Sequence, residues 1–295
     1  MACSRPRRYS RAAIDGAPRS VFVHLRVLLP ILLALAATPL AAPAQSDTTR
    51  RSADPLFTRR DAVVGAAFVV GTVALLPFDK RLSEQFQRPS NHPRGFVASL
   101  DSAFRLTAAP GALLIGGTMY AVGRIAHIER AADLGLHGTE ALLVGSAVGG
   151  LIKGTLGRAR PYAVKDSNAY DFKLGRGFTK GSPYSSLPSG HTAAAFAAAA
   201  AVTAETSKWW PHQKLLIGTA MYGGATMVAL SRMYDDKHWA SDVVLGAAIG
   251  TFSGWKVVQY HHSHPGNRID RWLLSATVTP APDGGLVMAW TIAPR

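Results

Sequence analysis

A histidine and an aspartate four residues apart, His238 and Asp242, lie shortly after Arg232 in the second half of the chain. If a helix begins near His238, both side chains lie on one face of it. A carboxylate that accepts one imidazole N–H fixes the tautomer, so the other nitrogen can act as a nucleophile or a base. Taken alone, the pair could equally be a surface contact, with Asp235–Lys237 as a solvated turn.

A second group is the tetrapeptide Pro188-Ser189-Gly190-His191, which precedes an alanine-rich run. Alanine favours helix, and Ser189 is a good N-cap residue. The free N–H groups of such a helix start, with a glycine that permits close approach, can bind an anion. His191 would then lie beside that anion. An ordinary capped helix with an incidental histidine is an equal alternative for this group alone.

A third group contains Lys153 and Arg160, seven residues apart, with Pro161 next. If the helix that contains Ala141 continues this far, both cations lie on one face, and Pro161 ends the helix. Two cations at the end of an apolar helix favour a phosphate partner, which suits the arginine fork. On its own, the group is more typical of cations that flank a membrane helix.

Together the three groups resemble the type 2 phosphatidic acid phosphatase (PAP2) and vanadium haloperoxidase superfamily. The pattern of that superfamily is K-x6-RP, then PSGH, then SR-x5-H-x3-D. The chain has each fixed residue in order: Lys153, Arg160, Pro161, Pro188, Ser189, Gly190, His191, Ser231, Arg232, His238 and Asp242.

The resemblance implies a metal-independent phosphatase that acts on a lipid phosphate or an isoprenyl diphosphate through a phosphohistidine. The implied catalytic residues are His238 as nucleophile, Asp242 as its orienting group and His191 as general acid. Lys153, Arg160, Ser189, Gly190 and Arg232 are the implied phosphate-binding residues. No cofactor and no metal site are expected; His261, His262 and His264 could bind an ion, but a polar tail after the last helix is the favoured interpretation.

Six uncharged runs predict an all-α bundle of about six helices that resembles the PAP2 fold. Their Ala- and Gly-rich composition allows close helix packing, either in a bilayer or in a soluble exported domain, and we favour the membrane. A terminal β-hairpin is predicted from two β-prone stretches around an Asp-Gly turn. Segments 79–104 and 161–187 are expected to be irregular. The runs are Ala62–Phe78, Leu106–Gly123, Ala141–Ile152, Thr192–Ala204, Leu215–Leu230 and Val243–Trp255, and the hairpin stretches are Trp272–Thr279 and Leu286–Ile292.

Composition and the leader agree with an envelope protein. Hydrophobic residues make up 48% of the 295 residues, which excludes a disordered chain, and the lone Cys3 excludes a disulfide scaffold. A basic stretch, an apolar run and a small-residue cleavage pattern predict a signal peptide or anchor over residues 1–44. A linker over 45–60, a phosphatase domain over 61–258 and a tail over 259–295 follow. The net charge of +14 suits an anionic lipid or phosphorylated substrate; we expect no nucleic-acid partner.

Alternative functions fit the same pattern. A soluble exported acid phosphatase and a vanadate-dependent haloperoxidase are the enzymatic ones, and a silent membrane protein that binds anionic lipids is the non-enzymatic one. The sequence also gives conflicting indications of the side of the membrane on which the site lies. Relatives suggest an inner-membrane enzyme with a periplasmic site, or a soluble periplasmic one. Three spanning helices after an exported N-terminus, with the basic loop after Phe78, would instead place Lys153 in the cytoplasm.

Overall fold

The computed structural model describes residues 55–88, 109–164, 166–264, 267–274, 276–280 and 286–290. The chain divides into two compact units, 1–41 and 42–295, and all described residues belong to the second. The predicted leader therefore lies outside the described residues, as does most of the predicted linker.

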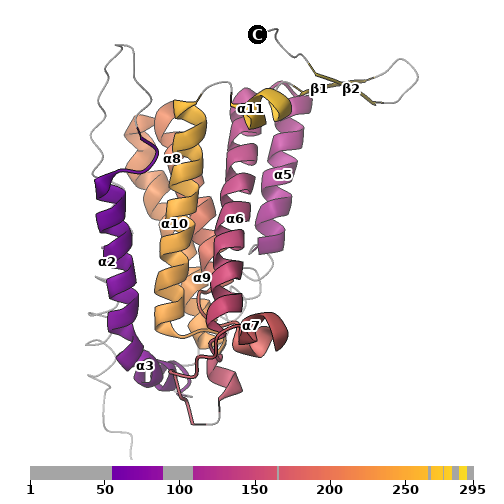
Figure 1. The fold of residues 1–295 in the computed structure, drawn as a ribbon. Coiled ribbons are helices and arrows are strands. Elements are labelled where there is room, and N and C mark those ends of the chain that lie inside the picture. Colours follow the sequence, from indigo (N-terminus) through magenta and orange to yellow (C-terminus); the bar gives the residue numbers. More distant parts are fainter. Residues whose placement is uncertain are drawn as a thin grey trace, which may run out of the picture. The chain divides into compact units, whose positions relative to one another are not determined.

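Six long helices form the body of this unit (Figure 1). Each overlaps one of the uncharged runs, so the six runs correspond to the six long helices among the described residues. Short helices α3, α7 and α11 accompany them. The long helices are α2 (Arg59–Leu75), α5 (Ala109–Ile125), α6 (Glu129–Leu156), α8 (Gly190–Trp209), α9 (Lys214–Tyr234) and α10 (Ala240–Ser263); the short ones are α3 (Asp79–Phe86), α7 (Arg176–Thr179) and α11 (Arg268–Leu273).

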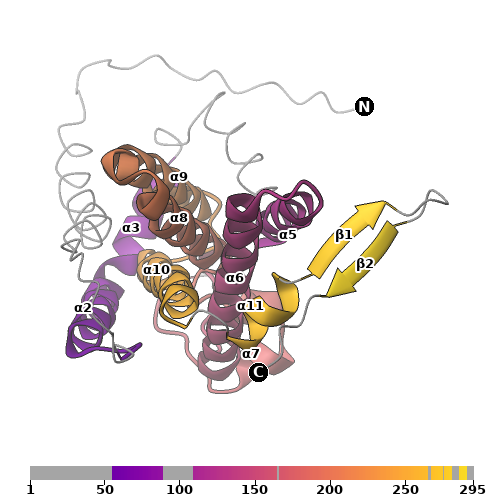
Figure 2. The same ribbon diagram turned by 90° about the horizontal axis from the view of Figure 1, so that it is seen from above.

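The pair α8 and α10 forms the centre of the bundle, with α6 and α9 beside it and α2 and α5 further out (Figure 2). Buried alanines such as Ala197 and Ala201 form much of the core. Because these side chains are small, the two backbones come close together: a Cβ added at Gly250 would lie 2.2 Å from the carbonyl oxygen of Ala193. This contact requires glycine, and it fixes the register between α8 and α10.

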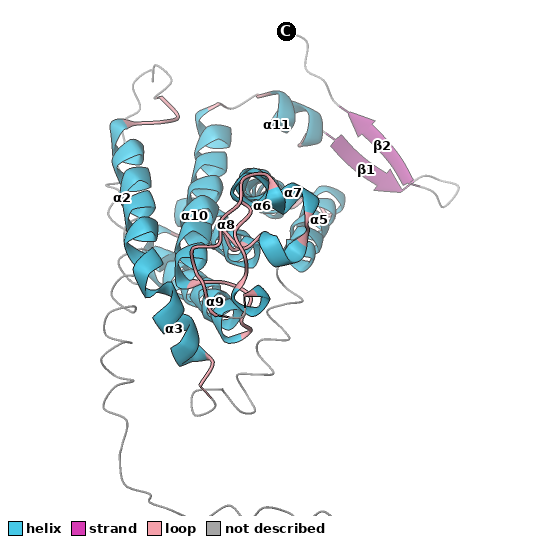
Figure 3. Ribbon diagram, turned by 60° about the horizontal axis from the view of Figure 1, so that its bottom comes forward, coloured by secondary structure: helices cyan, strands magenta, loops and turns pink. Residues whose placement is uncertain are grey.

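Successive helices run in opposite directions, so distant parts of the chain meet at each end. One end holds the close of α6, the start of α8 and the start of α10. Figure 3 brings this end forward, with α3, α7 and the connecting loops around it. The other end holds the close of α10 and α11. Residues 161–187 contain only short helical turns, as predicted for an irregular segment.

Large apolar side chains are exposed on the outer helices. Helix α2 joins a short 3-10 turn and α3, and Arg59–Phe86 is the single helical stretch among the described residues that is long and apolar enough to cross a membrane. Exposed apolar residues on long helices are more typical of a lipid-facing surface than of a soluble one. They include Val63, Val69, Val70, Val73, Leu114, Ile115, Val122, Leu143, Leu151, Leu215 and Leu216.

The expectation of an irregular segment from residue 79 is wrong over α3. The charged residues of Asp79–Phe86 are compatible with an amphipathic surface helix. Its apolar side packs inward, where the ring of Phe86 meets that of Tyr234 edge-on at 4.7 Å. Its first residue, Asp79, is completely buried. The rest of the expected segment, from residue 89 on, lies outside the described residues.

The chain ends in an antiparallel strand pair, β1 (Ala276–Pro280) and β2 (Leu286–Trp290), with Ala276 opposite Trp290. The first strand starts later than the sequence predicts, because Trp272 belongs to α11. The Asn267 side chain caps that helix by accepting from the N–H groups of Ile269 and Asp270. The turn of the predicted hairpin lies outside the described residues.

Candidate phosphate site

His238 lies in the turn before α10 and is 3% exposed. Its Nδ1 is 3.5 Å from Oδ2 of Asp242, the third residue of the helix. The predicted pairing is therefore present, although the helix begins at Ala240 and not at His238. A contact of 3.5 Å is longer than a strong hydrogen bond, and it leaves Nε2 as the nitrogen that faces away from the carboxylate.

Four protein groups fix the Asp242 carboxylate. Its Oδ1 accepts from Arg158 Nη1 at 2.6 Å, and its Oδ2 accepts from Ser186 Oγ at 2.5 Å and from the Trp239 N–H at 2.9 Å. The fourth is His238, whose Nδ1 lies 3.5 Å from Oδ2 and forms no hydrogen bond among the described residues. Since Asp242 is fully buried, these bonds replace the water that its charge would otherwise require.

Arg158 is a residue for which the sequence predicted no role. Its guanidinium is fully buried and bridges two carboxylates, with Nη2 2.7 Å from Asp79 Oδ2 and Nη1 2.6 Å from Asp242. The Ser241 N–H donates to Asp79 at 2.9 Å, so α3 is tied to the start of α10. The only sequence signal was a third cation between Lys153 and Arg160; nothing indicated Asp79.

Lys153 lies beside the start of α8. Its Nζ donates to the carbonyl of Ser185 at 3.0 Å and to that of Pro188. A Cβ added at Gly190 would lie 3.5 Å from Lys153 Cε, so glycine leaves the helix start open next to the ammonium. Ser189 is the N-cap residue, as predicted. Its side chain forms no capping bond, and its hydroxyl instead accepts from Thr192 at 2.9 Å.

Arg160 does not share a helical face with Lys153, so that expectation is wrong. Helix α6 ends at Leu156 because Gly157 adopts a left-handed conformation with φ 53°. Arg160 follows in extended backbone. Its side chain is held by the carbonyls of Ser182 at 2.8 Å and Lys237 at 3.3 Å, which brings it to the third group by a loop rather than by a helix.

Arg232 lies in the last turn of α9 and is 4% exposed. Its Nη2 forms an ion pair with Asp235. The interpretation of Asp235 as part of a solvated turn is therefore wrong, because a buried guanidinium needs a carboxylate nearby. A phosphate bound here would compete with Asp235 for Arg232.

The remaining predicted residue, His191, is half-buried in the first turn of α8, next to Gly190. The N–H of Ser189 donates to the carbonyl of Asp242 at 2.9 Å, so the helix that carries His191 is tied to the helix that follows His238. All three groups therefore reach one end of the bundle. The catalytic and binding roles of their residues stay predictions.

The electrostatic surroundings of His238 favour its neutral form. Burial, together with the charges of Lys153 and Arg160, lowers the pKa of His238 to about 3, against an opposing effect of Asp242. Lys153 and Arg160 interact with Asp242, and Arg160 also with Arg232. A neutral imidazole that feels the charges of Lys153 and Arg160 can attack an anionic phosphorus centre, which the cations attract.

Comparisons with known proteins give a family match and a curated relative. Residues 136–265, somewhat less than half of the chain, match the model of the PAP2 superfamily. The matched range contains all three groups of site residues. A curated relative, a lipid A 1-phosphatase from Porphyromonas gingivalis, is 36% identical over 104 residues. That match covers 35% of this chain and 22% of the relative, so the chain spans only about a fifth of its length.

A solved structure is also similar to this chain. It is a transmembrane PAP2-type phosphatidylglycerolphosphate phosphatase from Bacillus subtilis, with 17% sequence identity and a TM-score of 0.36. The match covers 82% of this chain and 98% of the other.

Proposed function

We propose that this protein is a phosphatase that hydrolyses a lipid phosphate through a phosphohistidine on His238. The observation that carries the proposal is the buried, neutral His238 held between Asp242 and the cations Lys153 and Arg160. The similarity to a lipid A 1-phosphatase supports a lipid phosphate as substrate. The residues provide what phosphoryl transfer mostly needs, namely position and positive charge.

In the first step, Nε2 of His238 forms a bond to phosphorus while the bond from phosphorus to the leaving oxygen breaks. The proton on Nδ1 faces Asp242, which stabilises the cationic imidazole that forms. His191 donates a proton to the leaving oxygen. In the second step, His191 takes a proton from water, the water oxygen bonds to phosphorus, and the N–P bond breaks to release inorganic phosphate.

The cations and the helix start hold the phosphoryl oxygens. Lys153 lies next to Gly190, so the ammonium and the N–H groups at the start of α8 can contact the same phosphate. Arg160 and Arg232 supply two further charges. Asp235 holds Arg232 until substrate binds.

The exposed apolar faces of α2, α5 and α6 favour a lipid substrate over a soluble phosphomonoester. A membrane around these helices would bring the lipid headgroup to the end of the bundle where the site lies. We further propose that this end faces the periplasm, as in the family that the sequence resembles.

Phosphoenzyme trapping tests the mechanism. With p-nitrophenyl phosphate, whose leaving group needs no proton, His191→Ala should give a burst of p-nitrophenolate equal to the enzyme, then slow turnover. The rate loss for the second step should be about 10²–10⁴-fold. Labelled phosphate should remain on the protein in an acid-labile, base-stable bond.

The control variants are His238→Ala, alone and combined with His191→Ala, and His212→Ala on the surface. His238→Ala and the double variant should give no burst and no label. His212→Ala should behave like the wild type. Vanadate should inhibit, and EDTA in the assay should not. A label that survives in the double variant would refute His238 as nucleophile, and vanadate- and peroxide-dependent halogenation would favour a haloperoxidase.

A further inference from the structure

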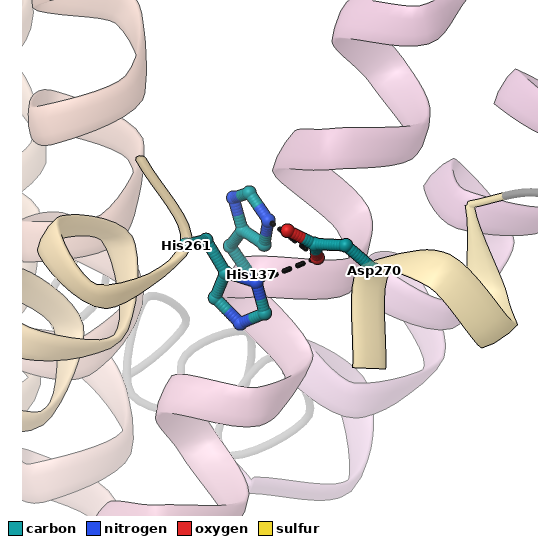
Figure 4. A group of neighbouring side chains, drawn as sticks. All are labelled: His137, His261 and Asp270. Carbon is teal, nitrogen blue, oxygen red and sulfur yellow. Dashed lines mark hydrogen bonds and ion pairs between the residues drawn. The ribbon is translucent and has the colours of Figure 1, made fainter. Parts of the chain in front are cut away.

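A second cluster of titratable side chains lies at the opposite end of the bundle from the phosphate site. It joins His137 of α6, His261 of α10 and Asp270 of α11 (Figure 4). His137 precedes Lys153 by sixteen residues on α6, which corresponds to about 24 Å along the helix. The cluster is therefore separate from the phosphate site, and the proposed phosphatase activity does not use it.

The cluster corrects one interpretation of the sequence. His261 was expected in a polar tail after the last helix, but α10 continues to Ser263 and His261 is 3% exposed. The uncharged run that predicted this helix ends earlier, at Trp255, because the charged Lys256 follows it, although Val258 in the next turn still packs in the apolar core. Burying a histidine here requires partners.

The three side chains direct ligand atoms at one point. His261 Nδ1 lies 2.6 Å from Asp270 Oδ1, and His137 Nε2 lies 3.7 Å from the same oxygen. The three ligand atoms all lie within 4.8 Å of one another. Ligands of a tetrahedral zinc ion, bound at about 2.0–2.2 Å, are about 3.3 Å apart. Only small side-chain movements would therefore convert the cluster into a zinc site.

His137 Nε2 is the most informative atom of the cluster. It is buried and has no hydrogen-bond partner within the part of the chain that the structure describes. Buried polar atoms are nearly always paired, so an unpaired one calls for an explanation. The atom faces Asp270 across the centre of the cluster, where a bound cation would be its partner (Figure 4).

The outer nitrogens of the two histidines have the partners that metal-binding histidines usually have. His137 Nδ1 lies 2.5 Å from Glu205 Oε1, and His261 Nε2 lies 2.6 Å from Glu140 Oε2. Each carboxylate can accept the outer N–H, so the inner nitrogen of each ring can bind a metal once it carries no proton. His137 Nε2 has no hydrogen-bond partner among the described residues, whereas His261 Nδ1 donates to Asp270 Oδ1 at 2.6 Å and would lose that proton on metal binding. Asn267 in turn donates to Asp270 Oδ2 at 2.6 Å, which leaves Oδ1 for the centre.

The local charge also favours a dication. The carboxylates Glu140, Glu205 and Asp270 contact the histidines directly, and Asp133 interacts electrostatically with His137 and Asp270. In the metal-bound arrangement both histidines are neutral, so a divalent ion would offset this negative charge. Two imidazoles and a carboxylate are ligands that zinc accepts, with water in the fourth position.

We propose that His137, His261 and Asp270 bind one zinc ion, which fastens α11 to the ends of α6 and α10. A second group, His137, Glu205 and His262, could compete for the ion through the other nitrogen of His137. Glu205 is less available, because its carboxylate already accepts from His137 and from His262 at 2.9 Å. The ion has a structural role, since the chain segments that it joins are far apart in sequence.

The test uses the full-length, untagged chain in detergent, dialysed against micromolar ZnCl2 and then against metal-free buffer. Mass spectrometry of the metal should give about one zinc per chain. His137→Gln, His261→Gln and Asp270→Asn should each reduce this at least tenfold. The matched control, His262→Gln, should keep the zinc.

Further measurements distinguish a variant that has lost zinc binding from one that has failed to fold. Each variant must elute as a single species with the helical circular dichroism of the wild type before its metal is counted. Zinc should raise the Tm of the wild type and of His262→Gln, and should not raise that of Asp270→Asn. Cobalt loaded in place of zinc should give intense visible bands with the wild type and His262→Gln, and not with His137→Gln, His261→Gln or Asp270→Asn.

Two outcomes would overturn the proposal. One is a wild-type chain with less than a tenth of a zinc ion and no Tm response to ZnCl2. The other is loss of zinc in His262→Gln while His261→Gln keeps it, which would move the ion to the competing group. None of these readings depends on phosphatase activity, so the proposal and the proposed function can fail separately.

Discussion

Arg158 Nη1 lies 2.6 Å from Asp242 Oδ1, and both side chains are fully buried. The other end of the same guanidinium holds Asp79, so one arginine joins α3 to the residue that orients His238. Arg158 touches no reacting atom in the proposed mechanism. It is a positioning residue whose effect on catalysis passes through Asp242.

Arg158→Lys should therefore impair the chemical step more than substrate binding. Lysine keeps the charge but cannot contact both carboxylates as the planar fork does. We expect kcat to fall about 10- to 100-fold while KM changes less than threefold. Steady-state kinetics with a phosphatidate or p-nitrophenyl phosphate would measure this. Arg176→Lys, which alters an arginine bonded to Gly157 and Asp171, serves as the control. Equal losses in both variants would indicate general destabilisation.

The pKa of His238 predicts that acid destabilises the protein through this residue. Its pKa is lowered to about 3 when folded, against about 6.5 when unfolded. The unfolded chain therefore binds one more proton between these values. Stability is present above pH 6.5 and is lost as the pH falls towards 3, by about 1.4 kcal/mol per pH unit.

Replacing His238 with Gln should remove that slope. Thermal unfolding of wild type and variant at pH 7, 6, 5 and 4 would give the Tm difference at each pH. The wild type should lose stability faster than His238→Gln on acidification. Parallel curves would mean that His238 is protonated in the folded protein, which argues against a neutral nucleophile.

Gly250 should tolerate no side chain, because α8 passes against it. A Cβ there would lie 2.2 Å from the Ala193 carbonyl oxygen and 2.8 Å from the Ala197 nitrogen. Gly250→Ala should force the helices apart and cost about 1–3 kcal/mol, as overpacking does. Gly150, in α6 with open space around it, is the matched control. Gly150→Ala should be neutral or stabilise by up to about 1 kcal/mol through helix propensity. Chemical unfolding of both variants would compare them.

Reporter insertions at two positions, one at each end of the bundle, can show which side of the membrane the phosphate site faces. Gly175 lies in the segment between α6 and α8 at the phosphate end, and Ser207 lies near the close of α8 at the other end. With β-lactamase inserted at each position, the Gly175 insertion should protect cells from ampicillin and the Ser207 insertion should not. The reverse pattern would place the phosphate site in the cytoplasm, as counting helices from an exported N-terminus suggests.

The sequence was sufficient for the helices and for most of the candidate site. Apolar runs located all six long helices because helix formation depends on residues within a few turns of one another. The spacing of His238 to Asp242 was equally local and brings the two side chains together, whereas the spacing of Lys153 to Arg160 does not place both on one helix. The sequence shows a glycine at position 157. It does not show that this glycine adopts the left-handed conformation that ends α6, because that depends on the contacts that Arg160 makes in the folded chain.

Only the tertiary structure decided which distant side chains meet. Asp79 contacts Ser241 across 162 positions of sequence, and His261 contacts Glu140 across 121. Such pairs depend on the register between packed helices, which close contacts such as that of Gly250 set. A one-dimensional pattern carries the period of each helix but not the rotation and offset between helices. The residues that position Asp242 and those that form the second cluster could therefore be assigned only from the folded chain.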